Sequence, residues 1–198
     1  MRLIALIGAK QSGKTTVSNL LVTHHGFRRV RFADALKQML RTLGLSEAQI
    51  EGDQKEVPSC LLGGKTPRWA MQSLGTEWGR DLISQDIWVN ACRQHVADLL
   101  GKGHKVVIDD CRFPNEVAMI HELHGELWRI RRSEVEVQIG PLTRWLVRRG
   151  WSKKIHPSEL YWPEFKADVE IPNDARLIDL QTQVQKKLRR MPVMEVSR

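Results

Sequence analysis

The sequence has few cysteines and lacks a long hydrophobic run. Its 198 residues contain three cysteines, Cys60, Cys92 and Cys111, whose odd number and wide spacing favour neither a disulfide framework nor a zinc site. So few cysteines are typical of a reducing compartment, and we expect a cytoplasmic location. No apolar stretch approaches the length that crosses a bilayer, and the first apolar run leads into a glycine-rich turn instead of a signal-peptide cleavage site. We therefore expect no membrane partner.

Internal repeats and low-complexity segments are also absent from the sequence. With 41% hydrophobic and 27% charged residues, the composition is typical of a globular protein, and the length predicts one domain over residues 1–198. Much of the net charge of +8 comes from residues 128–154, which hold eight basic residues and two acids. Such a segment suits nucleic-acid binding and equally suits a lid over polyphosphate, and composition does not decide between them.

Residues 8–15 match the phosphate-loop pattern G-x-x-x-x-G-K-[ST]. The apolar run 3–7 before them predicts a buried parallel strand, and residues 14–25 predict a helix, which together are the context that the motif requires. Glycines let backbone N–H groups surround phosphate oxygens at the helix N-terminus. Lys14 can reach the β- and γ-phosphates, and Thr15 offers a hydroxyl to Mg²⁺. The motif therefore predicts binding of nucleotide phosphates.

Strand and helix signals alternate along the rest of the chain. This alternation predicts an α/β fold of three layers, with a mostly parallel sheet and helices on both faces. The predicted strands cover residues 3–7, 27–32, 105–110, 127–130 and 169–171. The predicted helices cover residues 14–25, 35–43, 67 onward, 87–100, 115–124 and 177–190.

The signals are weaker between residues 34 and 80. Asp34 is predicted to cap the helix over residues 35–43. Residues 44–66 contain four glycines and one proline and show little periodicity, so we expect a mobile insertion. Gly75 and Gly79 weaken the later part of the helix that begins at Pro67, which favours a break near them.

Asp109 and Asp110 are candidate metal ligands. They end an apolar strand, and a carboxylate in that position beside a phosphate loop can hold Mg²⁺ or its waters. An acid in the turn that follows a strand is the ordinary alternative.

Arg68, Gln72, Gly75 and Gly79 are spaced by three or four residues, so they are predicted to share one helical face. The glycines would admit a ligand close to the backbone, and Arg68 and Gln72 would supply hydrogen-bond donors. An ordinary packing face with a solvated arginine fits the same spacing.

Longer stretches of the chain are similar to one known family. They include R-x-x-x-Q-x-x-G-T-E from residue 68 and D-x-R-F-P-N-E from residue 110, which are far more specific than the phosphate loop. The chain resembles the phage-type deoxynucleoside monophosphate kinases, within the nucleoside monophosphate kinase-like branch of phosphate-loop proteins. The similar stretches follow one another in the expected order: 8–15, 32–37, 68–80, 86–89, 110–116, 156–159 and 171–174.

The resemblance implies a phosphate-loop kinase fold with a core (about 1–32, 104–130 and 168–190), an acceptor-binding region (about 33–103) and a lid (about 131–160). It implies ATP as the phosphoryl donor with Mg²⁺, and a location in the host cytoplasm if a phage encodes the chain. The expected ATP-binding residues are Gln11, Ser12, Gly13, Lys14, Thr15, Thr16, Pro172 and Asp174. The expected residues for the acceptor monophosphate are Lys10, Asp34, Lys37, Arg68, Gln72, Arg80, Trp88, Arg112 and Trp151. The expected catalytic residues are Lys14, Arg131, Arg132, Arg144 and Arg148, and the expected metal ligands are Thr15, Asp109 and Asp110.

The reaction implied is transfer of a phosphoryl group from ATP to a deoxynucleoside monophosphate. The acceptor phosphate has a second pKa of about 6, so at neutral pH it is mostly dianionic and needs no general base. One alternative is a nucleic-acid-binding ATPase that uses residues 128–154 and 186–190, although no base-reading module accompanies them and we do not expect nucleic acid as a partner. Another is a kinase similar to dephospho-coenzyme A kinase, with Asp34 as the candidate base. The accepted bases and the choice between a monomer and a homodimer stay open.

Overall fold

The computed structural model describes residues 2–135 and 162–190. The chain divides into two compact units, which are built from different segments. The first unit comprises residues 1–30 and the chain from residue 96 onward, and the second comprises residues 31–95.

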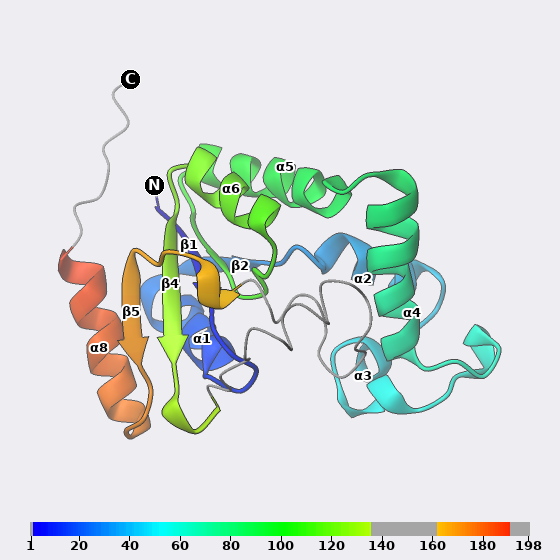
Figure 1. The fold of residues 1–198 in the computed structure, drawn as a ribbon, viewed down its shortest axis with the longest axis horizontal. Helices are drawn as coiled ribbons and strands as arrows, with labels where there is room; N and C mark the ends of the chain where they lie inside the picture. The colour runs from blue at the N-terminus through cyan, green and yellow to red at the C-terminus, as the bar shows by residue number, and fades with distance from the viewer. Residues whose placement is uncertain (1, 136–161, 191–198) are drawn as a thin grey trace. The chain divides into compact units, whose positions relative to one another are not determined.

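The first unit is built on a five-stranded sheet in which all paired strands are parallel (Figure 1). The strands lie in the order β2-β3-β1-β4-β5. Their bounds are β1 (Arg2–Ile7), β2 (Phe27–Val30), β3 (Lys105–Ile108), β4 (Glu126–Arg131) and β5 (Val169–Pro172). The central β1 is buried from residue 3 to residue 7, as expected for an uninterrupted apolar run between two helical layers.

Helices cover both faces of this sheet. Ile4 and Leu6 of β1 belong to a core cluster that also contains Leu21 of α1 (Lys14–His25) and Val184 of α8 (Leu177–Arg190). Neighbouring strand residues point to opposite faces, so Leu3 lies on the other side. There, Leu3 and Ile120 of α6 (Pro114–Glu122) both contact the position of Gly125. The predicted three-layer α/β fold is confirmed.

The second unit is helical. Its elements are α2 (Asp34–Thr42), α3 (Glu47–Ile50), the 3₁₀ turns η1 (Asp53–Glu56) and η2 (Cys60–Leu62), α4 (Pro67–Ser73) and the π-helix η3 (Leu74–Ile83). Leu40, Leu45, Ile50 and Ala70 form a small core between them. The long helix α5 (Ile87–Gly101) begins in this unit and continues into the first.

The prediction of a mobile insertion over residues 44–66 is wrong for its N-terminal part. Ser46 and Gln49 form a capping box at the start of α3, and Ile50 is fully buried. A helix of four residues is too short to show periodicity, and its stability depends on packing. The S-x-x-Q spacing at 46–49 is nevertheless a sequence signature of a helix N-terminus.

The expected break near Gly75 and Gly79 is also wrong, because α4 passes directly into η3. The start is as predicted: Pro67 occupies the first turn, and the hydroxyl of Thr66 accepts a hydrogen bond from Trp69 N. Further along, Gly79 makes room for the ring of Trp88, since a Cβ at this position would lie 2.6 Å from that ring. Close packing therefore explains a glycine that local propensity alone treats as a helix breaker.

Asp34 does not cap α2 in the predicted manner. The helix begins at Asp34 itself, and Ala33 occupies the cap position. The Asp34 carboxylate accepts a hydrogen bond from Arg31 N at 2.7 Å, three residues upstream. The carboxylate thus holds the turn that enters α2.

Candidate active site

The phosphate loop connects β1 to α1, and its backbone takes conformations that favour glycine. Gly8 and Gly13 have φ values of +142° and +104°, and Gln11 has a φ of +66°. A Cβ at Gly8 would lie 2.3 Å from Ile130 O on the neighbouring β4, which leaves no space for any other residue. The motif glycines are therefore required by backbone geometry and by the proximity of the next strand.

Lys14 and Ser12 place polar groups inside this loop. The Lys14 ammonium donates to Gly8 O at 2.8 Å and to Ala9 O at 2.6 Å. Ser12 is fully buried, and within the described part of the chain its Oγ has no hydrogen-bond partner. No acidic residue lies in the first turn of α1, so the positive end of the helix dipole is not offset there. These features make the loop suited to binding an anion.

Asn173, which follows the edge strand β5, contacts the phosphate loop. Its Nδ2 donates to Ser12 O at 2.9 Å, and its backbone N donates to Arg131 O at 2.7 Å. A Cβ at Gly13 would lie 2.3 Å from the same Nδ2. Sequence reasoning selected the neighbouring Pro172 and Asp174 and missed Asn173, although the turn that contains it belongs to a similar stretch.

The carboxyl end of β3 carries the two candidate metal ligands. Asp109 is 8% exposed and its Oδ2 lies 3.4 Å from Nε of Arg29, which also donates to Ser18 Oγ at 2.7 Å. Asp110 is half-buried, and Thr15 is exposed in the first turn of α1. Among the residues that the structure describes, no three His, Cys, Asp or Glu side chains are grouped to hold a metal ion.

The segment after β3 is held by Glu116 of α6. This residue is 1% exposed, and its Oε2 accepts hydrogen bonds from Arg112 N at 2.6 Å and from Phe113 N at 3.0 Å. Arg112 itself is exposed, as are Lys10 of the phosphate loop and Gln11. The buried carboxylate thus fixes the backbone from which the predicted acceptor residue Arg112 projects.

In the second unit, the predicted acceptor residue Lys37 and two arginines that sequence reasoning missed lie around one carboxylate. Glu51 Oε1 lies 2.7 Å from Lys37 Nζ, 3.2 Å from Arg31 Nη1 and 3.8 Å from Arg41 Nη2. Burial alone would raise the pKa of the Glu51 carboxyl, but the hydrogen bond from Lys37 and the nearby positive charges outweigh it and lower that pKa. We refer to Arg31, Lys37 and Arg41 as the cation cluster.

Lys55 and Arg68 extend the positive charge around the cation cluster. Burial lowers the pKa of Lys55, and repulsion from Lys37, Arg68 and Arg31 lowers it further, whereas Glu51 raises it. Arg68 pairs with Glu56 at 2.6 Å, and Gln72 is exposed one turn further along α4. The structure thus places the positive charges of Lys37 and Arg68 near the same residue, Lys55.

Two further predicted acceptor residues, Trp88 and Arg80, both donate hydrogen bonds to the backbone of η3. Trp88 is 3% exposed, and its indole N–H donates to Gly75 O at 2.8 Å. Arg80 Nη1 donates to the same carbonyl at 3.1 Å. The side of the helix that carries Gly75 and Gly79 therefore packs against Trp88 of the same unit. This contact supports the interpretation of that spacing as an ordinary packing face.

Comparison with known proteins agrees with the geometry of the phosphate loop. No protein-family model matches the sequence. A protein of Acanthamoeba polyphaga mimivirus, named "Putative deoxynucleotide monophosphate kinase", is 34% identical over 197 residues, which cover 93% of this chain and 94% of that protein. The chain belongs to the deoxynucleotide monophosphate kinase family. The resemblance carried by the sequence motifs is confirmed.

Solved structures are similar to this kinase in fold at low sequence identity. The crystal structure of TT1252 from Thermus thermophilus is 20% identical, with a TM-score of 0.53, and the match covers 97% of this chain and 98% of that one. A dephospho-CoA kinase from Campylobacter jejuni is 13% identical, with a TM-score of 0.49 and 96% of each chain covered.

The predicted lid arginines of this kinase begin with Arg131, the last residue of β4. Arg131 lies 3.7 Å from Glu170, and Arg132 lies 2.8 Å from Glu134. Arg144, Arg148 and Trp151 lie outside the described residues. The predicted ATP residue Asp174 accepts hydrogen bonds from Ser133 N at 2.7 Å and from Ser133 Oγ at 3.0 Å. The backbone bond is the main reason that the pKa of the Asp174 carboxyl lies below its ordinary value.

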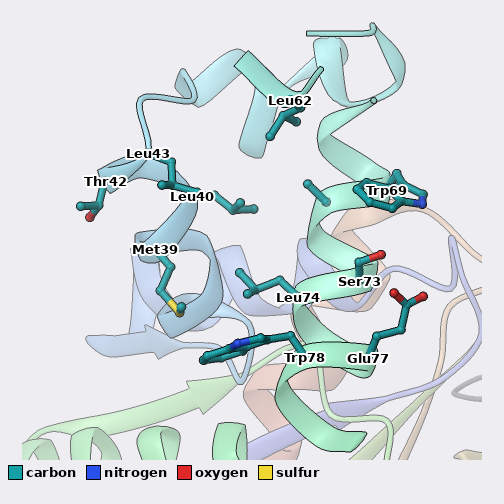
Figure 2. A pocket seen from close by; sticks show the side chains of 11 residues that line it. Met39, Leu40, Thr42, Leu43, Leu62, Trp69, Ser73, Leu74, Glu77 and Trp78 are labelled. Atoms are coloured by element: carbon teal, nitrogen blue, oxygen red, sulfur yellow. The ribbon is translucent and has the colours of Figure 1, made fainter. Parts of the chain in front are cut away.

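An apolar pocket of about 540 Å³ opens on the second unit of the kinase, between α2 on one side and α4 and η3 on the other (Figure 2). Figure 2 shows Met39 and Leu40 facing Leu74 and Trp78 across it. Among the residues that the structure describes, the lining includes Glu77 but no lysine, no arginine and no predicted site residue. The described lining of this pocket therefore lacks the positive charge that a phosphate group requires.

Among the described residues, no helix is both long and apolar enough to cross a membrane.

Proposed function

We propose that the protein transfers the γ-phosphoryl group of ATP to the phosphate of a deoxynucleoside monophosphate, yielding a deoxynucleoside diphosphate and ADP. The observation that carries this proposal is the phosphate loop with Lys14 inside it, found in a chain of the deoxynucleotide monophosphate kinase family. A dianionic acceptor phosphate already carries the attacking charge, so the reaction needs positioning and positive charge instead of a general base.

The phosphate loop would hold the donor. Backbone N–H groups at the start of α1 and the Ser12 hydroxyl face a bound phosphate in this proposal, and its oxygens give the buried Ser12 Oγ a hydrogen-bond partner. Lys14 would exchange a loop carbonyl for a phosphate oxygen. Gln11, Gly13, Thr16, Pro172 and Asp174 complete the proposed ATP site, and Arg131, Arg132, Arg144 and Arg148 are proposed to neutralise charge as it develops.

The residues near the loop fit Mg²⁺ as the cofactor. Mg²⁺ is commonly bound by one or two protein oxygens together with substrate phosphates, and the exposed Thr15 hydroxyl and the carboxylates of Asp109 and Asp110 are oxygen donors of that kind. The ion would neutralise the β- and γ-phosphates when bound. Asp109 already pairs with Arg29, so we propose that this arginine holds the carboxylate in place.

We propose that positively charged side chains bind the acceptor phosphate. In the second unit, Lys37 and Arg68 both lie near enough to Lys55 to repel its charge, which supports a shared role in binding an anion. Lys10, Asp34, Gln72, Arg80, Trp88, Arg112 and Trp151 stay proposed acceptor-binding residues.

Replacement of Lys14 tests the proposal. With Mg²⁺, ATP and each of the four deoxynucleoside monophosphates, the parent should form diphosphate product, and Lys14→Ala should form it more than roughly tenfold more slowly. Lys102→Ala is the matched control, because Lys102 pairs with Asp98 at 2.8 Å on an exposed surface. ATP hydrolysis that responds to DNA and not to any monophosphate would instead favour a nucleic-acid-dependent ATPase.

A further inference from the structure

Three cations of the second unit converge on a single oxygen atom. Lys37, Arg31 and Arg41 all make their contacts with Glu51 through Oε1, at distances between 2.7 and 3.8 Å. The Lys37 and Arg31 side chains are only 12% and 22% exposed, so they are partly removed from water. Partly buried positive charges that face one another need an anion between them, and Glu51 supplies it.

The backbone of Glu51 is fixed, whereas its carboxylate remains accessible. Its N–H donates to Glu47 O at 2.7 Å, and the preceding Ile50 is fully buried. The Glu51 side chain is 32% exposed. A rotation of this side chain toward solvent would therefore release Oε1 from the cation cluster without unfolding α3.

We propose that Glu51 is an internal counter-anion, which holds the cation cluster together until the acceptor phosphate displaces it. This inference rests on the proposed function, because it assigns the cation cluster to the acceptor phosphate. A carboxylate carries one negative charge and a nucleoside monophosphate carries nearly two, so at equal distance the Coulomb attraction to the cluster is about twice as large. Glu51 thus makes the site selective: a dianionic phosphate displaces it, and weaker anions do not.

Glu51→Gln tests this role, since the amide keeps the shape of the side chain and an oxygen acceptor but removes its charge. We expect the dissociation constant for inorganic phosphate, measured by calorimetry without ATP, to fall by roughly fivefold. The KM for the monophosphate should fall by a similar factor, while the KM for ATP changes by less than about twofold.

Asp98→Asn is the matched control, since it removes the charge of a carboxylate that pairs with Lys102 at 2.8 Å and is 53% exposed. Lys102 is not part of the cation cluster, so this replacement should leave phosphate affinity unchanged. Glu51→Asp keeps the charge on a shorter side chain, and we expect a smaller gain in phosphate affinity than with glutamine.

The opposite result overturns the inference. If Glu51→Gln folds, as judged by its circular dichroism and melting temperature, and binds phosphate equally or more weakly, Glu51 does not compete with the anion. The calorimetry does not depend on catalysis. A parent that binds phosphate more weakly than Glu51→Gln, yet forms no diphosphate, would therefore refute the proposed function and keep the counter-anion.

Discussion

Asn173 determines the position of the phosphate loop by a hydrogen bond that spans 161 residues of sequence. Its amide group donates to Ser12 O, and the glycine at position 13 leaves the space that this amide occupies. The loop motif by itself fixes the chemistry of Lys14 and Thr15. The precise backbone position depends on a residue after the last strand of the sheet.

Asn173→Ala should weaken ATP binding without abolishing the reaction. A net hydrogen bond is worth about 1 kcal/mol, so the KM for ATP should rise roughly fivefold while the KM for the monophosphate changes little. Gln183→Ala is the matched control, because this amide donates to Pro172 O at 3.1 Å and does not contact the loop. Equal effects of the two substitutions would contradict a specific role for Asn173.

His25 makes stability depend on pH. Burial, together with the charges of His24 and Lys105, lowers the pKa of the His25 imidazole below its ordinary value of 6.5. The unfolded chain then binds a proton more readily than the folded one, so stability should decline as the pH falls below about 6.5. His25→Gln should reduce this decline in urea-unfolding measurements between neutral and mildly acidic pH. An unchanged slope would exclude this contribution.

The residues that could be predicted from sequence are those whose role is local. Lys14 and Thr15 follow from a motif with fixed spacing, and Asp109 follows from its place at the end of an apolar strand. Asn173 acts through Ser12, 161 residues away. Glu51 acts through cations of another helix and of the turn before it, so no local pattern marks either residue. The capping motif beside Glu51 identifies a helix start but not the cations that Glu51 gathers.

At the scale of elements, η3 shows why helix propensity is a weak guide at a packed interface. Gly79 faces the ring of Trp88, and Gly75 supplies the carbonyl that accepts the indole N–H. Propensity predicts a break here, whereas the contacts with a neighbouring helix support a continuous one. β1 was predictable because its uninterrupted apolar run makes burial and local preference agree, and α1 was predictable because the phosphate-loop motif marks its start.

Gly79→Ala and Gly75→Ala should separate the roles of these two glycines. A Cβ at Gly79 would lie 2.6 Å from Trp88, so this substitution should lower the free energy of unfolding by about 1–3 kcal/mol. A Cβ at Gly75 would lie 3.6 Å from Leu36, an ordinary contact, and its substitution should change stability by less than about 1 kcal/mol. Chemical denaturation checks both values. Similar losses for both variants would show that Trp88 does not set the difference.

At the scale of the whole molecule, the parallel order of the sheet brings distant segments to one edge. The phosphate loop follows β1, Asp109 follows β3 and Asn173 follows β5, and the carboxyl ends of parallel strands share one edge. The α/β class and the order of elements could be predicted from sequence. The strand order and the division into two compact units could not, since they depend on contacts between remote segments.

Binding of Mg²⁺ and ATP should stabilise the folded protein as a whole. At a hundredfold excess over the dissociation constant, ligand binding adds about 2.7 kcal/mol to the free energy of unfolding. The parent should therefore melt at a higher temperature with both ligands present, and chelation of Mg²⁺ by EDTA should remove most of that gain. Lys14→Ala should show little gain. A gain of equal size in that variant would contradict the role of the loop lysine.

The bond between Asn173 and Ser12 has a consequence for synthesis of the chain on the ribosome. Residue 12 is made well before residue 173, and at about 5–20 residues per second the interval is roughly ten to thirty seconds. During that time the nascent polypeptide carries the complete nucleotide motif but not the side chain that holds it. The hydrogen bond that holds the loop can thus form only after residue 173 has been made.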